Sequence, residues 1–142
     1  RFWTERTVDF KGEFDQVHHA GVNPPSIQRP IPVWFGGGAD AVLRRAARYG
    51  QGWIPLGNPG SKTQAQLTAL QGYLRDEGRD PSAFGVEAWL RSNLGGADDW
   101  RAAADTWTGL GASHLTFYTS GLGVGPVDKQ IEAMRAFKAV MA

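Results

Sequence analysis

Short apolar runs alternate along the chain with longer amphipathic segments. Four of these runs have the composition of buried β-strands, and each is followed by a segment whose apolar residues recur every three to four positions, as in a helix with one buried face. The predicted strands are 31–35, 52–56, 84–92 and 114–119, and the predicted helices are about 39–49, 62–79, 98–110 and 127–141. Strict alternation predicts four parallel strands joined by helical crossovers of one hand.

The predicted fold class is therefore α/β. The pattern fits either a small open sheet or part of a (β/α) TIM barrel, and it does not choose between them. In both architectures ligands gather at the carboxyl ends of the strands. Chemistry is therefore expected just after Phe35, Leu56, Arg91 and Thr119.

The first 30 residues differ from the rest. They are polar and irregular, Val8–Phe14 alternates like a short strand with a glycine turn, and prolines hold the following backbone extended. We expect residues 1–30 to form a surface excursion that leads into 31–142. His18 and His19 are neighbours and would point to opposite faces of a strand, so exposed histidines are expected there and no metal site is predicted. Because the chain begins without Met, we expect a processed, truncated or cut chain.

Three consecutive glycines connect the first predicted strand to its helix. Gly36, Gly37 and Gly38, followed by Ala39, leave backbone N–H groups uncovered just before a helix N-terminus, where an anion is favoured. The simplest ligand is a phosphate. The alternative is a tight turn that needs glycine for geometry alone. The segment fits neither the dinucleotide pattern G-x-G-x-x-G nor a Walker A loop, which requires a lysine.

Composition narrows the function classes. The 142 residues carry 15 basic and 14 acidic side chains, a net charge of +1, which favours neither nucleic acid nor an anionic membrane. No apolar run approaches the roughly 20 residues of a membrane helix. The absence of Cys excludes disulfides and thiolate metal sites and suits a cytoplasmic protein.

Other candidate residues lie on or near the predicted strand ends. Arg91 ends the third strand and is a candidate for binding an anionic substrate or the tail of a cofactor, although a solvated arginine fits equally well. Glu87 shares its face of the strand. Trp53, Trp89 and Tyr118 are candidates for stacking on a planar ring, with core packing as the alternative.

With these positions located, the chain resembles the C-terminal half of the bacterial-luciferase-like family of flavin- and deazaflavin-dependent oxidoreductases. The resemblance is carried by residues 28–38, which end in the three glycines, and by 43–55, 78–81 and 111–115. It implies strands five to eight of a (β/α)8 barrel. It also implies that the loop Gly36 to Ala39 contacts the phosphate of FMN or of the deazaflavin coenzyme F420. Relatives often have a hydroxyl residue after the glycines, whereas this chain has Ala39 and Asp40.

The resemblance implies part of an oxidoreductase that acts on a small organic substrate, either as a monooxygenase or by hydride transfer. Most redox-side contacts in the family come from the other half of the barrel, so no catalytic residue is named and the chain alone is expected to be inactive. Because half a barrel exposes two edge strands, we expect a homo-oligomer or association with a complementary half barrel. The alternative function is a non-catalytic module that binds a phosphate-bearing ligand, or a remnant that binds nothing.

Overall fold

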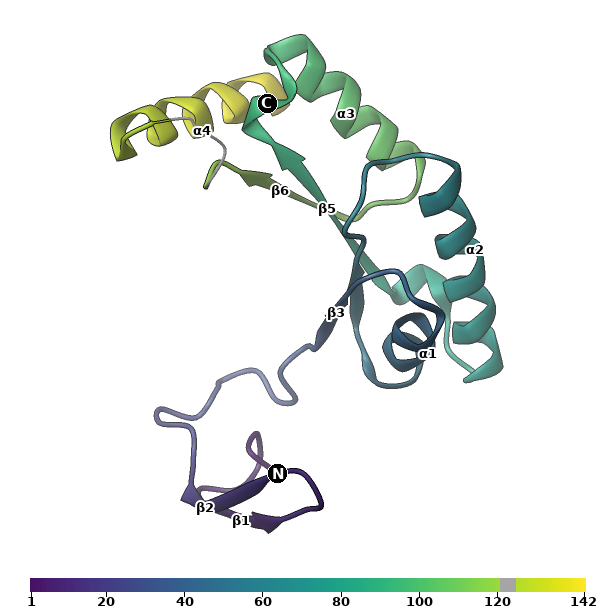
Figure 1. Ribbon diagram of the computed structural model, residues 1–142, viewed down its shortest axis with the longest axis vertical. Helices are drawn as coiled ribbons and strands as arrows, with labels where there is room; N and C mark the ends of the chain where they lie inside the picture. The colour runs from purple at the N-terminus through teal and green to yellow at the C-terminus, as the bar shows by residue number, and fades with distance from the viewer. Residues whose placement is uncertain (121–124) are drawn as a thin grey trace. The chain divides into compact units, whose positions relative to one another are not determined.

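The computed structural model describes residues 1–120 and 125–142 (Figure 1). The chain divides into two compact units, Arg1–Pro32 and Val33–Ala142. The first contains an antiparallel hairpin of β1 (Val8–Lys11) and β2 (Gln16–Ala20). The sequence predicted the first strand but not the second, because β2 is almost entirely exposed and so lacks an apolar face. Both adjacent histidines lie in β2 and are exposed.

The second unit is built on a four-stranded parallel sheet, which confirms the predicted α/β class. Its strands follow the order of the chain, so each pairs with the next one through a helical crossover. The strands are β3 (Trp34–Gly36), β4 (Gly52–Ile54), β5 (Gly85–Arg91) and β6 (His114–Tyr118).

Helices cover one face of this sheet, and the opposite face carries no helix of the unit (Figure 1). Their bounds are α1 (Asp40–Tyr49), α2 (Ser61–Asp76), α3 (Ala97–Gly109) and α4 (Val127–Met141), with short 3-10 turns at Pro81–Ala83 and Ser92–Leu94. The face without helices is called the uncovered face below. Side chains of β5 alternate, so Val86, Ala88 and Leu90 are buried toward the helices and Glu87, Trp89 and Arg91 lie on the uncovered face.

Three predicted boundaries are corrected. The first strand begins at Trp34 rather than Ile31, because proline cannot donate to a ladder and the Val33 N–H donates to the Gln51 side chain, 2.8 Å away. The second helix ends at Asp76 rather than near 79. The second strand ends at Ile54 rather than Leu56, because Pro55 cannot donate to a ladder. The sequence also predicts a loop over residues 120–126, between the last strand and the last helix, and this loop lies partly outside the described residues.

Two apolar clusters hold the helices to the sheet. One lies under α1 and α2 and the other under α3, and small alanines in α1 and α3 let both helices approach the strands closely. The buried members are Leu43, Ala46, Ala47, Trp53, Leu67, Leu70, Leu74, Phe84 and Val86 in the first, and Ala88, Leu90, Ala104 and Trp107 in the second.

Trp34 lies across the amino end of the uncovered face. A Cβ atom placed on Gly52 would come within 2.2 Å of its ring, and one on Gly85 within 2.3 Å. The ring continues to His114 on β6, with centroids 5.0 Å apart and an edge-on geometry. Two glycines at matching positions of β4 and β5 therefore make room for one indole.

Candidate functional site

The glycine loop lies at the carboxyl ends of β3 and β4. Gly36 ends β3, and the Gly37 N–H donates to the Ile54 carbonyl, 3.1 Å away, which ties the loop to the end of β4. Gly37 has φ +111°, a conformation that side chains rarely adopt, so glycine is required at this position. Helix α1 then begins at Asp40.

Two side chains bind the carbonyl oxygens of the loop. The Trp53 indole N–H donates to the Gly37 oxygen at 2.5 Å, and the Gln66 amide donates to the Gly38 oxygen at 2.9 Å. In a trans peptide the next N–H points opposite to the carbonyl, so the N–H groups of Gly38 and Ala39 point away from these donors. No side chain caps the N-terminus of α1. The loop therefore presents donors and hides acceptors, as an anion site requires.

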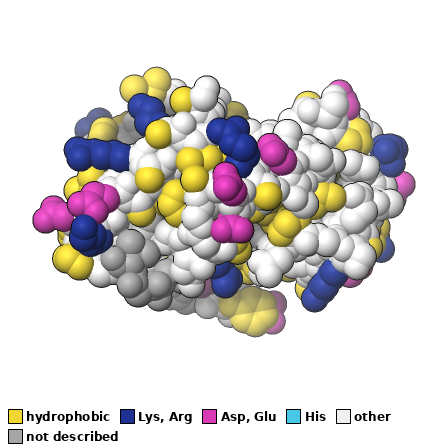
Figure 2. Space-filling model, turned by 90° about the horizontal axis from the view of Figure 1, so that it is seen from above, with side chains coloured by type: hydrophobic (Ala, Val, Ile, Leu, Met, Phe, Trp, Pro, Cys, Tyr) yellow, Lys and Arg dark blue, Asp and Glu magenta, His cyan; other side chains and the backbone are white. Residues whose placement is uncertain are grey.

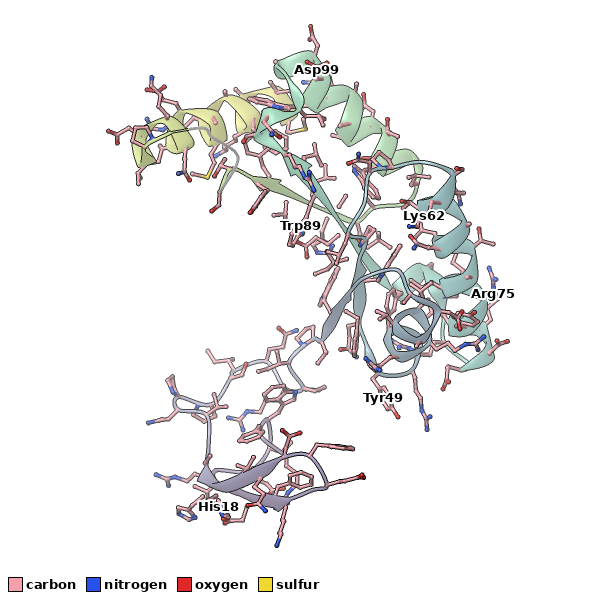
Figure 3. All side chains as sticks on the ribbon, in the orientation of Figure 1. His18, Tyr49, Lys62, Arg75, Trp89 and Asp99 are labelled. Atoms are coloured by element: carbon pink, nitrogen blue, oxygen red, sulfur yellow. The ribbon has the colours of Figure 1, made fainter. Side chains whose placement is uncertain are left out.

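A pocket of about 410 Å³ opens beside the loop. Lys62, from the first turn of α2, is the one charged residue in its lining (Figure 3 labels it). The Thr63 hydroxyl in the same turn donates to the Asn58 carbonyl, 2.8 Å away, and fixes the connection from β4 to α2. The lining residues are Gly38, Ala39, Leu56, Gly57, Asn58, Lys62, Thr63 and Gln66.

Asp40 does not line this pocket. Its carboxylate accepts hydrogen bonds from the Tyr73 hydroxyl and from Arg44, the latter at 2.8 Å. These two bonds, that of Tyr73 first, lower the pKa of Asp40 below its ordinary value. The Arg44 guanidinium also stacks over the Tyr73 ring, 4.0 Å from its centroid. The one acidic residue next to the glycines is thus bound to α1 and α2.

The sequence-predicted cofactor residues, Gly36 to Ala39, lie together in this loop, and two of them line the pocket. Lys62 and Gln66 were not predicted. Their contribution depends on α2 lying beside α1, which is a tertiary contact. The available signal was that Lys62 follows the end of a predicted strand by a few residues, on the edge where ligands bind.

The other predicted candidates lie elsewhere in the sheet. Trp53 is fully buried between sheet and helices, so it is a core residue that holds the loop and not a surface for stacking. Arg91 ends β5 with an exposed side chain on the uncovered face. Trp89 and Tyr118 lie on that face too, and Figure 3 shows Trp89 on the side away from the helices.

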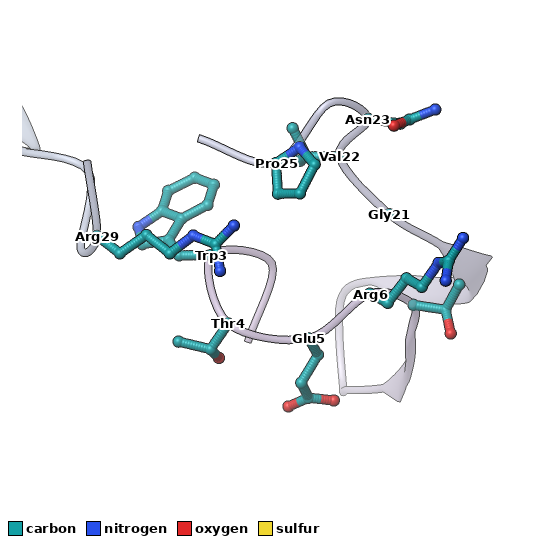
Figure 4. A pocket seen from close by; sticks show the side chains of 10 residues that line it. Trp3, Thr4, Glu5, Arg6, Gly21, Val22, Asn23, Pro25 and Arg29 are labelled. Atoms are coloured by element: carbon teal, nitrogen blue, oxygen red, sulfur yellow. The ribbon is translucent and has the colours of Figure 1, made fainter. Parts of the chain in front are cut away.

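A separate pocket of about 540 Å³ lies within the first unit (Figure 4). Trp3, Arg6, Pro25 and Arg29 are among its lining residues. Arg29 is bound locally, through its Nε to the Ser26 carbonyl at 2.7 Å. The described residues contain no group of His, Asp and Glu arranged to hold a metal ion.

Charged side chains do not gather by sign on the face drawn in Figure 2, where basic and acidic groups are interspersed. No helix in the described residues is both long and apolar enough to cross a membrane.

Curated relatives with assigned activities match this chain. It is 34% identical over 119 residues to the F420-dependent glucose-6-phosphate dehydrogenase of Segniliparus rotundus, an alignment covering 80% of this chain and 34% of the relative. It is 29% identical over 108 residues to the F420-dependent hydroxymycolic acid dehydrogenase of Mycobacterium tuberculosis, covering 75% and 29%. The chain thus spans about a third of the length of these relatives.

Solved structures share the fold. The monooxygenase RslO1 of Streptomyces bottropensis superposes with a TM-score of 0.72 at 19% identity, over 99% of this chain and 56% of that protein. The coenzyme F420-dependent tetrahydromethanopterin reductase of Methanopyrus kandleri superposes with a TM-score of 0.64 at 14% identity, over 89% and 56%.

The family model of the luciferase-like monooxygenases matches residues 1–138, nearly the whole chain. This match confirms the resemblance drawn from the sequence, and the F420-dependent relatives show that F420 is a cofactor within the group. The chain belongs to the luciferase-like monooxygenase family, and its sheet and helices are those of a luciferase-like TIM-barrel protein.

Proposed function

We propose that this chain is the cofactor-phosphate-binding part of an F420-dependent oxidoreductase that acts on a small organic molecule. The observation that carries the proposal is the glycine loop, whose two carbonyl oxygens are bound by Trp53 and Gln66 while its amide donors remain available beside Lys62. The names of the relatives support F420 over FMN. The loop itself fits the phosphate of either cofactor.

In this proposal F420 supplies hydride chemistry when bound, and the described residues bind and orient it. The N–H groups of Gly38 and Ala39 and the first turn of α1 donate to the phosphate. Lys62 contributes a compact positive charge. Trp53 and Gln66 hold the loop in the donating orientation, and Arg44 and Tyr73 keep the Asp40 carboxylate engaged, so that it does not repel the phosphate.

No catalytic residue is assigned within the chain. In our proposal the groups on the redox side of the cofactor belong to the remaining length of the barrel. The 142-residue chain by itself is therefore expected to bind cofactor without turning it over. Measurable oxidation or reduction of F420 or FMN by this chain would contradict that part of the proposal.

The phosphate site is tested with pairs of ligands in which one member carries the phosphate and the other lacks it. Equilibrium dialysis of the 142-residue chain compares FMN with riboflavin, and F420 with a deazaflavin that lacks the phosphate. We expect the phosphorylated member of each pair to bind more tightly, and F420 to bind more tightly than FMN. Equal binding within both pairs would reject the phosphate site, whereas an FMN preference would reject only the cofactor assignment.

The contribution of Lys62 is tested by Lys62→Gln. Because the lysine is exposed, its ion pair with a phosphate is worth at most about 1 kcal/mol, so the preference for the phosphorylated ligand should fall about threefold to fivefold. Lys11→Gln is the matched control, since Lys11 is an exposed lysine in the β1 strand of the other unit. It should leave the preference unchanged. If the two substitutions change the preference equally, Lys62 does not bind the phosphate.

A further inference from the structure

An aromatic pair lies open on the uncovered face of β5 and β6. The Trp89 and Tyr118 rings are stacked, with centroids 5.9 Å apart and planes 18° from parallel. Trp89 is 43% exposed and Tyr118 is 37% exposed. Each ring therefore has surface that is not used by the other, and such surface favours a further flat ring stacked upon it.

Glu87 holds the Trp89 ring in place through hydrogen bonds. Its Oε1 accepts a hydrogen bond from the Trp89 indole N–H at 3.1 Å and another from the Thr116 hydroxyl at 2.6 Å. Thr116 is the register partner of Trp89 on β6, so one carboxylate oxygen links both strands beneath the rings. This arrangement makes Glu87 a positioning residue for the Trp89 ring.

Arg91 brings a positive charge to the same surface. It lies two residues beyond Trp89 on β5 and is the register partner of Tyr118, so the three side chains leave the sheet as neighbours on one face. The ion pairs of the described residues do not include Arg91. An exposed guanidinium beside stacked rings matches a planar molecule that carries a negative charge.

We propose that Trp89, Tyr118 and Arg91 bind the organic substrate, and that this substrate is a planar conjugated molecule bearing a carboxylate or phosphate. Identification of the bound molecule as the substrate rests on the proposed function above, whereas the existence of the binding surface does not depend on it. The glycine loop follows β3, which lies two strand spacings from β5 and three from β6, a distance of about 10 to 14 Å. The ring of the cofactor is also planar, and the experiment below distinguishes it from the substrate as the ligand of this surface.

The probe is 2-naphthoate, compared with the neutral 2-naphthalenemethanol, which has the same ring system. Titration calorimetry and saturation-transfer NMR on the 142-residue chain should show that the anion binds about threefold to fivefold more tightly, as expected for an exposed ion pair. Arg91→Gln should abolish that difference, and Arg75→Gln, an exposed arginine in the last turn of α2, should preserve it. Equal affinity for the two probes, or binding of neither, would overturn the proposal.

The ring surface is tested separately. Trp89→Leu should weaken both probes about threefold to tenfold, whereas Trp89→Phe, which keeps a ring, should weaken them less. Glu87→Gln keeps an oxygen acceptor and should retain affinity, whereas Glu87→Leu should lose it; circular dichroism confirms that each variant is folded. If Trp89→Leu binds the probes as tightly as the parent chain, the Trp89 ring is not part of the binding surface. If Glu87→Gln loses as much affinity as Glu87→Leu, Glu87 does not position the Trp89 ring.

Two phosphate-free compounds distinguish the two sources of a planar ligand: riboflavin, which has the ring of FMN, and the deazaflavin that lacks the phosphate, which has the ring of F420. If either displaces 2-naphthoate and binds more tightly, the surface holds the cofactor ring and the substrate assignment is wrong. The outcomes are independent of the cofactor-phosphate test. If the chain prefers 2-naphthoate to the neutral probe but does not prefer phosphorylated cofactors, only the proposed function is rejected. If it prefers phosphorylated cofactors but binds the two naphthalene probes equally, only this inference is rejected.

Discussion

Gly85 and Gly52 lie beneath the Trp34 indole, where neither has room for a side chain. The close approach lets one ring extend over β4 and β5 and reach His114 on β6. The amino end of the uncovered face is therefore filled by a residue of its edge strand, while the carboxyl half presents the exposed side chains of Trp89, Arg91 and Tyr118. Glycine at these positions is a requirement of packing rather than of backbone conformation.

Gly85→Ala should lower the free energy of unfolding by about 1–3 kcal/mol, because the Trp34 ring must shift to admit the methyl group. Gly72→Ala is the matched control, since a Cβ there meets nothing within 4 Å in the interior of α2. Better helix propensity should make that variant neutral or stabilise it by up to about 1 kcal/mol. Urea denaturation measures both, and equal stabilities of the two variants would contradict the packing role of Gly85.

Asp40 makes the folding stability of the chain depend on pH. Its pKa is lowered in the folded state by hydrogen bonds from Tyr73 and Arg44, so the stabilisation is present above its unfolded pKa and is lost as pH falls through the folded pKa. Asp40→Asn should therefore show a smaller drop in Tm between pH 7 and acidic pH than the parent chain. Asp105→Asn, an exposed aspartate on α3, should keep the full drop. A full drop in Asp40→Asn would contradict the role of these bonds.

Helix α1 is held at both ends by hydrogen bonds from side chains, of which Tyr73 and Arg79 come from the segment that follows it and Arg44 from α1 itself. At its start Arg44 and Tyr73 bind Asp40. At its end the Arg79 guanidinium donates to the carbonyls of Ala47 and Gly50, the latter at 2.7 Å. These are carbonyls that a helix end leaves without partners. The helix whose N-terminus faces the proposed phosphate is thereby fixed relative to α2.

Arg79→Met keeps the apolar part of the side chain but removes both hydrogen bonds, and it should cost about 2–3 kcal/mol of unfolding free energy. Arg75→Met provides the comparison, because Arg75 is an exposed residue of α2, and its cost should stay within about 0.5 kcal/mol. Urea denaturation of both variants measures the difference. Arg79 would have no capping role if both losses were alike.

Periodicity predicted the elements that have a buried face and failed on those that do not. Strands β4 and β5 and helices α1, α2 and α3 bury apolar residues, so their existence could be predicted from spacing. Strand β6 and helix α4 were predicted too, and they pack the partly buried Phe117, Phe137 and Met141 against the second cluster. Strand β2 buries almost nothing and was missed. The glycine loop was predicted from local chemistry. The parts played by Lys62 and Gln66, and the hydrogen bond from Trp53 to a carbonyl of the loop, could not be predicted because they depend on contacts between distant segments. Arg79 lies in a stretch noted only for its resemblance to the family.

The second unit has two unpaired sheet edges, at β3 and β6, in the part of the chain that the structure describes. Unpaired edge strands favour pairing with the edge strands of another sheet. The chain covers 56% of each of the two solved structures.

We therefore expect the isolated chain to self-associate. Light scattering should give a mass of at least twice the chain mass of 15.4 kDa, and the mass should fall on dilution. Coexpression with a complementary half barrel, if one is found, should replace the self-associated form. A well-folded monomer that persists at high concentration would contradict this expectation.

In our proposal the backbone after β3 binds the cofactor phosphate. The amide ¹H–¹⁵N signals of Gly38, Ala39 and Asp40 test this binding during titration with F420 and with its phosphate-free analogue. F420 should shift these signals and that of Lys62, and the analogue should shift them far less. Equal shifts with both ligands, or shifts confined to other residues, would show that the loop does not bind the phosphate.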